Sequence, residues 1–121
     1  MYGGFWKGRF IQKLFLDGQT IVLDDYLEIR DEIKKLIKYI KEGKFIIGPW
    51  YILQDEFYTS GEANIRNLLV GMKEAEKYGA MCKMGYFPDA FGNAGQMPQI
   101  LKQAGMDTVD IRTWCTPCRI W

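Results

Sequence analysis

Four carboxylates stand directly after short apolar runs, where a chain of alternating strands and helices usually carries its chemistry. Asp17 follows the first such run, Asp55 and Glu56 follow the second, and Asp89 follows the third. Carboxylates bind cations, accept hydrogen bonds from hydroxyl groups and act as nucleophiles, and aromatic faces such as that of Trp50 pack on the apolar side of sugar rings. This combination is what a sugar-binding site would need.

Each of these residues also has a plainer interpretation. Asp17 before a glycine is typical of an Asx turn, and Trp50 could be a core residue that happens to follow a strand. Asp55 and Glu56 could be solvated. Asp89 is the strongest candidate, because an aspartate after Pro88 at the end of a strand is well placed to point into a cleft.

The elements that must position these residues alternate between strand and helix. The expected strands are one ending at 15–16, then 44–47, 84–87 and one beginning near Thr108, and the expected helices are 28–42, 60–78 and one beginning at Pro98. Ser60 is expected to cap its helix, and glycines at 43, 79 and 105 are expected to end the three helices. This order predicts an α/β fold with right-handed crossovers and a parallel sheet, either a small doubly wound domain or part of a closed barrel.

Periodicity also predicts which helix faces point inward. The expected inward residues are Ile29, Ile33, Leu36, Ile37 and Ile40 in the first helix, and Ile65, Leu68, Leu69, Met72 and Ala75 in the second. In such folds the loops after the strands meet at one rim. We therefore expect the carboxylates and Trp50 to lie near one another.

Composition narrows the classes of protein and the kinds of partner. Sixteen Lys and Arg residues balance fifteen Asp and Glu, which argues against a nucleic-acid or membrane-surface binder. The longest mostly apolar stretch, 45–53, is shorter than the roughly 20 residues of a membrane helix. Three cysteines form no disulfide framework and no signal peptide is visible, so a cytoplasmic location is expected. The chain contains no histidine.

Three segments in the same order resemble bacterial members of the glycoside hydrolase family 38 α-mannosidases. These segments are Leu16–Thr20 with Asp25–Glu28, Ile47–Leu53 with Asp55–Phe57, and Gly85–Asn93 with Gln96–Leu101. The last resembles the segment that carries the family's nucleophile. The resemblance covers residues 15–109, and three ordered motifs are far more specific than one.

The resemblance implies a retaining exo-acting glycosidase that removes α-linked mannose from oligosaccharides, with a zinc ion that orients the sugar hydroxyls. Asp89 would be both the nucleophile and a zinc ligand, and a nearby dication would keep its carboxylate ionised. Trp50, Asp55 and Glu56 would shape the sugar pocket. Asn93 stands where many members of the family have histidine. The fold would be part of an incomplete (β/α) barrel within the N-terminal catalytic domain.

Other parts of the family's site have no counterpart in this chain. The acid that protonates the leaving oxygen is expected further along the barrel, and the zinc site also needs a His-x-Asp element and a later histidine. We therefore expect a fragment that is inactive alone. An opened barrel would leave unpaired edges, which predicts that Leu36, Ile40 and Trp50 face water and that the chain aggregates or stays molten.

The last segment, 110–121, reads unlike the rest and is interpreted as an out-of-frame tail. Shifting suitable synonymous codons by one base gives a sequence that resembles the family's next strand and loop. The start, 1–12, is interpreted as damaged or internal. Sequencing the flanking DNA would test both ideas.

Two functions of other classes remain open. One is a small α/β module that binds sugar through the Trp50 and Asp89 rim without hydrolysis. The other is a thiol–disulfide protein that uses Cys115 and Cys118.

Overall fold

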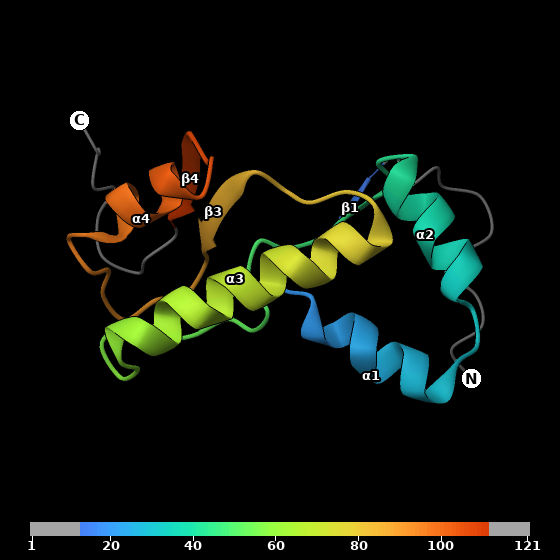
Figure 1. Ribbon diagram of the computed structural model, residues 1–121, viewed down its shortest axis with the longest axis horizontal. Helices are drawn as coiled ribbons and strands as arrows, with labels where there is room; N and C mark the ends of the chain where they lie inside the picture. The colour runs from blue at the N-terminus through green and yellow to red at the C-terminus, as the bar shows by residue number, and fades with distance from the viewer. Residues whose placement is uncertain (1–12, 112–121) are drawn as a thin grey trace.

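The computed structural model describes residues 13–111, which alternate between parallel strands and helices (Figure 1). The elements are β1 (Leu14–Phe15), α1 (Ile21–Ile29), α2 (Ile33–Lys41), β2 (Phe45–Ile46), α3 (Gly61–Tyr78), β3 (Met84–Phe87), α4 (Met97–Gln103) and β4 (Thr108–Ile111). The predicted α/β class and the order of strands are confirmed. The proposed start at 1–12, residues 112–121 of the proposed tail, and Cys115 with Cys118 lie outside the described residues.

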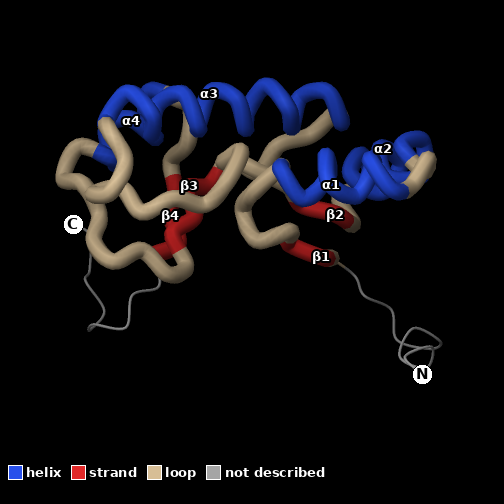
Figure 2. The backbone as a smooth tube through the Cα atoms, turned by 90° about the horizontal axis from the view of Figure 1, so that it is seen from below, coloured by secondary structure: helices blue, strands red, loops and turns tan. Residues whose placement is uncertain are grey.

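The strands form two parallel pairs, as the helical connections require. Strand β1 pairs with β2 and β3 pairs with β4, and a parallel bridge between Gln19 and Trp50 continues the first pair. A backbone hydrogen bond of 2.9 Å from Cys82 N to Ile47 O ties the segment before β3 to the end of β2. The long helix α3 lies across both strand pairs, and α1 and α2 extend beyond its C-terminal end (Figures 1 and 2).

The helix expected over 28–42 is confirmed over 33–41, but its expected start at 28 is wrong, and helix α1 before it was not expected. Helix α1 ends at Ile29, Arg30 is extended (φ −128°, ψ 125°), and α2 begins at Ile33. The break lets each helix turn its own apolar side chains, among them Leu23 and Leu36, onto one core, which one straight helix could not do. Ile29 and Ile33, both expected inside, are 80% and 43% exposed.

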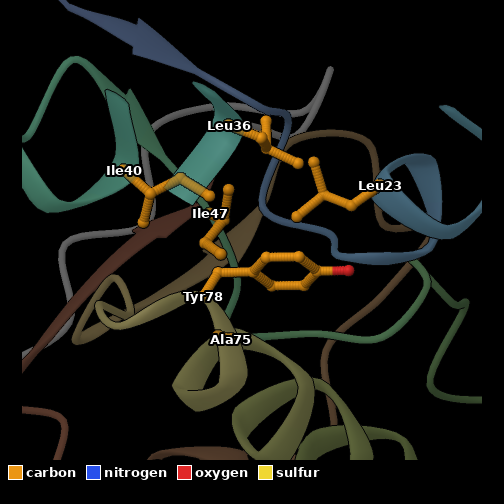
Figure 3. Close-up of a cluster of buried hydrophobic side chains, with 6 residues drawn as sticks. All are labelled: Leu23, Leu36, Ile40, Ile47, Ala75 and Tyr78. Atoms are coloured by element: carbon orange, nitrogen blue, oxygen red, sulfur yellow. The ribbon is translucent and has the colours of Figure 1, made fainter. Parts of the chain in front are cut away.

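The core beside β1 and β2 is closed by side chains from the three helices α1, α2 and α3 and by Ile47, which follows β2 (Figure 3). Its buried members are Leu23, Leu36, Ile40, Ile47, Ala75 and Tyr78. The expectation that Leu36, Ile40 and Trp50 face water is wrong, because they are 6%, 1% and 1% exposed. The chain buries them with its own residues: α3 covers the first core and also supplies part of a second, around Trp50 and Phe87.

Helix α3 has the predicted ends but a different buried face. Ser60 accepts a hydrogen bond from Ala63 N (3.1 Å), and Gly79 adopts the left-handed conformation (φ 96°), both as predicted. Ile65 and Leu69, expected inside, are 40% and 58% exposed. The buried face consists of Asn64, Leu68, Gly71, Ala75 and Tyr78. Because two of its residues are asparagine and glycine, this face does not stand out in the spacing of hydrophobic residues along the sequence. No helix in residues 13–111 has the length and hydropathy needed to span a bilayer.

Candidate active site

The loops that follow β1, β2 and β3 line one cavity of about 720 Å³. Each of the three loops contributes one carboxylate, and these are Asp17, Asp55 and Asp89. The aromatic lining residues are Trp50, Tyr58, Tyr86, Phe87 and Phe91. The carboxyl ends of parallel strands meet at one edge, so the gathering of these loops follows from the topology that the sequence predicts.

Asp89 reaches the cavity because β3 ends directly before it. Strand β3 buries Gly85 and Phe87, and Pro88, which cannot donate to a ladder, separates the strand from Asp89. The Asp89 residue is exposed and lines the cavity. Phe91 lines the same wall and is 80% exposed, which places a large apolar face next to the carboxylate.

Trp50 belongs to the core and to the cavity at once. It is only 1% exposed, its ring centroid lies 5.3 Å from that of Phe87, and its Nε1 donates a 2.9 Å hydrogen bond to the carbonyl oxygen of Tyr86. This bond joins the end of β2 to β3 directly below the cavity. The indole therefore forms the floor of the cavity, and the interpretation of Trp50 as a core residue is confirmed.

Helix α3 fixes the backbone around Trp50 by close approach. A Cβ atom built on Gly71 would lie 2.2 Å from the carbonyl carbon of Trp50 and 2.3 Å from Pro49 O and Tyr51 N. One turn earlier, Asn67 accepts from Ile52 N (3.0 Å) and donates to Ile52 O (2.7 Å). Only a glycine at position 71 allows the backbone of residues 49–51 to approach α3 so closely. Gly71 therefore determines how far the cavity floor lies from α3.

Asp17 is held by contacts from β3 and from its own loop. Its carboxylate accepts hydrogen bonds from the Tyr86 hydroxyl (3.3 Å) and from Gln19 Nε2 (3.5 Å). The residue has φ 49°, and Gly18 follows with φ 68° directly under the Tyr86 ring. Gln19 Oε1 also accepts from Leu53 N (3.2 Å), which links the first loop to the second.

The adjacent carboxylates Asp55 and Glu56 separate. Asp55 lines the cavity and accepts a hydrogen bond from Phe57 N (3.2 Å). Glu56 is 4% exposed and is not among the lining residues. Its Oε1 accepts from Asn93 Nδ2 (3.0 Å) and its Oε2 from Ala94 N. Asp55 therefore lies at the cavity, whereas the Glu56 carboxylate faces the loop that carries Asp89.

The positioning residues Gln19, Asn67, Gly71 and Tyr86 were not anticipated from the sequence. Gly71 carried a usable signal, because a glycine in a helix interior costs stability and often marks a close backbone approach. The two amides and the tyrosine carried none, since their partners are 15 to 69 residues away.

Comparison with known families identifies this arrangement. The model of the glycosyl hydrolases family 38 N-terminal domain matches residues 12–113, which is most of the chain and includes all three loops. The chain belongs to glycosyl hydrolase family 38. The family predicted from the three motifs is therefore confirmed, and the match is slightly wider than the predicted 15–109.

Relatives of the family 38 chain are much longer than it is. A protein of Halalkalibacterium halodurans named "Putative mannosylglycerate hydrolase" is 54% identical over 104 residues, which cover 84% of this chain and 12% of the relative. An α-mannosidase of Saccharomyces cerevisiae is 31% identical over 82% of this chain and 10% of its own length. The crystal structure of an α-mannosidase from Enterococcus faecalis superposes with a TM-score of 0.78 at 50% identity, covering 82% of this chain and 11% of that one.

The family 38 residues present here do not by themselves form the zinc site expected from the resemblance. Catalytic zinc takes three protein ligands, and no group of three His, Cys, Asp or Glu residues within 13–111 lies close enough to hold a metal ion. The complete sequence contains no histidine. Asp17, Asp55 and Asp89 therefore line the cavity as separate carboxylates and not as a ligand set.

Proposed function

We propose that the cavity is the part of an α-mannoside-binding site that carries the nucleophile, Asp89, of a retaining glycosidase. One observation supports this most: Asp89 lines the same cavity as Asp17, Asp55 and Trp50, at the strand ends of a family 38 chain. Carboxylates that accept hydroxyl hydrogen bonds, beside the exposed ring of Phe91, suit a sugar.

The proposed chemistry follows from an ionised carboxylate beside a sugar ring. An Asp89 oxygen donates its electron pair to the anomeric carbon while the bond from that carbon to the leaving oxygen breaks, giving a covalent ester. A second carboxylic acid, about 5–5.5 Å from the nucleophile, must protonate the leaving oxygen. Water then attacks the anomeric carbon, passing its proton to the second carboxyl group, which was deprotonated in the first step, and releases mannose and the Asp89 carboxylate. We place that acid outside residues 13–111, as the sequence predicts.

The order of the strands supports part of a (β/α) barrel as the larger architecture. Strands β1 to β4 are parallel within each pair, and the bond from Cys82 N to Ile47 O places the chain entering β3 beside β2. Sequential parallel neighbours with helical crossovers are the pattern of a barrel arc. A zinc ion remains a prediction for a longer protein only, with its further ligands outside the described residues.

The names of the relatives suggest two substrate classes, α-mannosides and mannosylglycerate. A chimera tests the proposal: residues 15–109 of this chain replace the matching segment of the 50% identical Enterococcus faecalis α-mannosidase. Hydrolysis of an aryl α-mannoside and of mannosylglycerate is then measured, together with the thermal midpoint.

We expect Asp89→Asn to lower kcat by at least about 10³-fold at an unchanged melting midpoint, because it removes the nucleophile. Asp55→Asn should mainly raise KM. A chimera that hydrolyses either substrate equally well with Asn at 89 would refute the role of Asp89. The 121-residue chain should show no turnover alone. Saturable mannose binding without turnover in both proteins would favour the binding module instead.

A further inference from the structure

A buried carboxylate beside the cavity is fully engaged by the loop that carries Asp89. Glu56 is 4% exposed, and its two oxygens accept from the Asn93 side chain and from the backbone N–H of Ala94. Two acceptors thus meet two donors from a loop 37 and 38 residues further along the chain. Burying a carboxylate is costly unless it is hydrogen-bonded in this way, so these contacts hold the loop firmly.

The other side of Glu56 is attached to α3. Its carbonyl oxygen accepts a 3.2 Å hydrogen bond from Asn64 Nδ2, and Asn64 Oδ1 accepts a 2.6 Å bond from the Thr59 hydroxyl. Asn64 is 6% exposed and lies in the first turn of the helix after the Ser60 cap. Glu56 therefore stands between a fixed helix and the loop.

A second contact supports the same attachment. A Cβ atom built on Gly92, which has φ +136°, would lie 2.4 Å from the ring of Phe57. The ring thus covers the backbone of residue 92 while Glu56 binds residues 93 and 94. Beyond them, Ala94 O accepts from Met97 N (2.9 Å) at the start of α4, so the far end of the loop is anchored as well.

We propose that Glu56 is a positioning residue that fixes the loop 88–96, and through it the orientation of Asp89 in the cavity. The inference rests on the proposed function only for the identity of Asp89 as the nucleophile. Glu56 is then not a sugar ligand. A carboxylate suits this task because it offers one acceptor oxygen to each donor. A glutamine at position 56 would keep one acceptor oxygen, for the N–H of Ala94. Its side-chain NH₂ would face Asn93, whose amide would have to flip and accept through its oxygen.

The test compares the 121-residue chain with its variants Glu56→Ala, Glu56→Gln, Asn93→Ala and Glu62→Ala. Glu62 is the matched control, because it is an exposed carboxylate that pairs only with Arg66 among the described residues and makes none of the contacts to loop 88–96. Amide hydrogen exchange at Ala94 and the side-chain carboxyl carbon resonance of Asp89 are followed by NMR.

Glu56→Ala should speed exchange at Ala94 by at least about tenfold and shift or broaden the Asp89 resonance, with α3 amides still protected. Glu56→Gln should stay within about threefold of the parent chain, and Asn93→Ala should give a smaller change than Glu56→Ala. If Glu56→Ala does not fold, Asn93→Ala tests the inference instead. This variant removes only one of the two hydrogen bonds to Glu56, and Asn93 is partly exposed, so the chain should still fold.

Unchanged exchange at Ala94, or an Asp89 resonance that moves equally in Glu62→Ala, would overturn the inference. These readouts need no turnover and no sugar. If the chimera shows no hydrolysis, the role of Glu56 in fixing loop 88–96 would still stand. If Glu56 does not fix the loop, the hydrolysis test of Asp89→Asn is unaffected.

Discussion

Gly71→Ala is expected to lift the cavity floor away from α3. The new Cβ would lie 2.2 Å from Trp50 C and 2.3 Å from Pro49 O and Tyr51 N. All three are backbone atoms, so no flexible side chain can swing aside. The backbone must retreat by about 1 Å to reach the 3.4 Å at which ordinary van der Waals contact begins.

Two effects of this substitution oppose each other. Alanine inside a helix is favoured over glycine by about 0.8–1 kcal/mol, which would stabilise an unhindered site. Overpacking a well-packed core costs typically 1–3 kcal/mol, and here the shift also strains the bond from Trp50 Nε1 to Tyr86 O. The structure places three backbone atoms within 2.3 Å, so we expect the cost to win by about 1–2 kcal/mol.

Gly61→Ala provides the matched control in the same helix, because nothing lies within 4 Å of its added Cβ. Urea unfolding should give a lower midpoint for Gly71→Ala and an equal or higher one for Gly61→Ala. The Trp50 indole N–H resonance should move only in Gly71→Ala. A Gly71→Ala chain as stable as the control, with this resonance unmoved, would show that the close approach does not hold the floor.

Three further substitutions test the indole hydrogen bond of Trp50, the cap of α3 and the core tyrosine Tyr78. Trp50→Phe should cost at least about 2 kcal/mol in urea unfolding, because it opens space and leaves Tyr86 O without its indole donor; an unchanged midpoint would contradict this. Ser60→Ala should cost about 1 kcal/mol through the lost cap at Ala63 N, with early α3 amides exchanging faster; equal exchange rates would argue against the cap. Burial, helped by Asp24, raises the pKa of Tyr78 above 10.0, so the unfolded chain ionises first and stability falls in alkali. Tyr78→Phe should reduce the difference between urea midpoints at about pH 8 and about pH 10.5, and an undiminished difference would exclude Tyr78 as its source.

Features of the fold that depend on local chemistry could be predicted from the sequence. The Ser60 cap, the glycine stop at Gly79 and the strand 84–87 appear as expected, since each follows from a residue type and its nearest neighbours. The break between α1 and α2 could not be predicted in this way. Its sequence is continuous in helical period, and the reason for the break is a core that both helices must reach.

The same distinction between local and long-range causes decides what could be predicted about the candidate site. That Asp17, Asp55 and Asp89 share one rim follows from strand order alone, because loops after parallel strands converge. The placement of Glu56 does not follow, since its partners lie 37 and 38 residues away and adjacent carboxylates look alike in a sequence. A motif can name a residue as part of a site without saying which way its side chain turns.

The buried face of α3 shows what determines the position of the site. Asn64, Asn67 and Gly71 follow one another at steps of three and four, and each contacts a loop instead of filling an apolar core. Asn64 holds Glu56, Asn67 holds Ile52, and Gly71 admits the backbone of Trp50. Apolar residues at these three positions would give a more regular helix stripe but would release both loops. Helix α3 therefore positions the floor and the Glu56 contact to the Asp89 loop through these three residues, while Leu68, Ala75 and Tyr78 pack in the two cores.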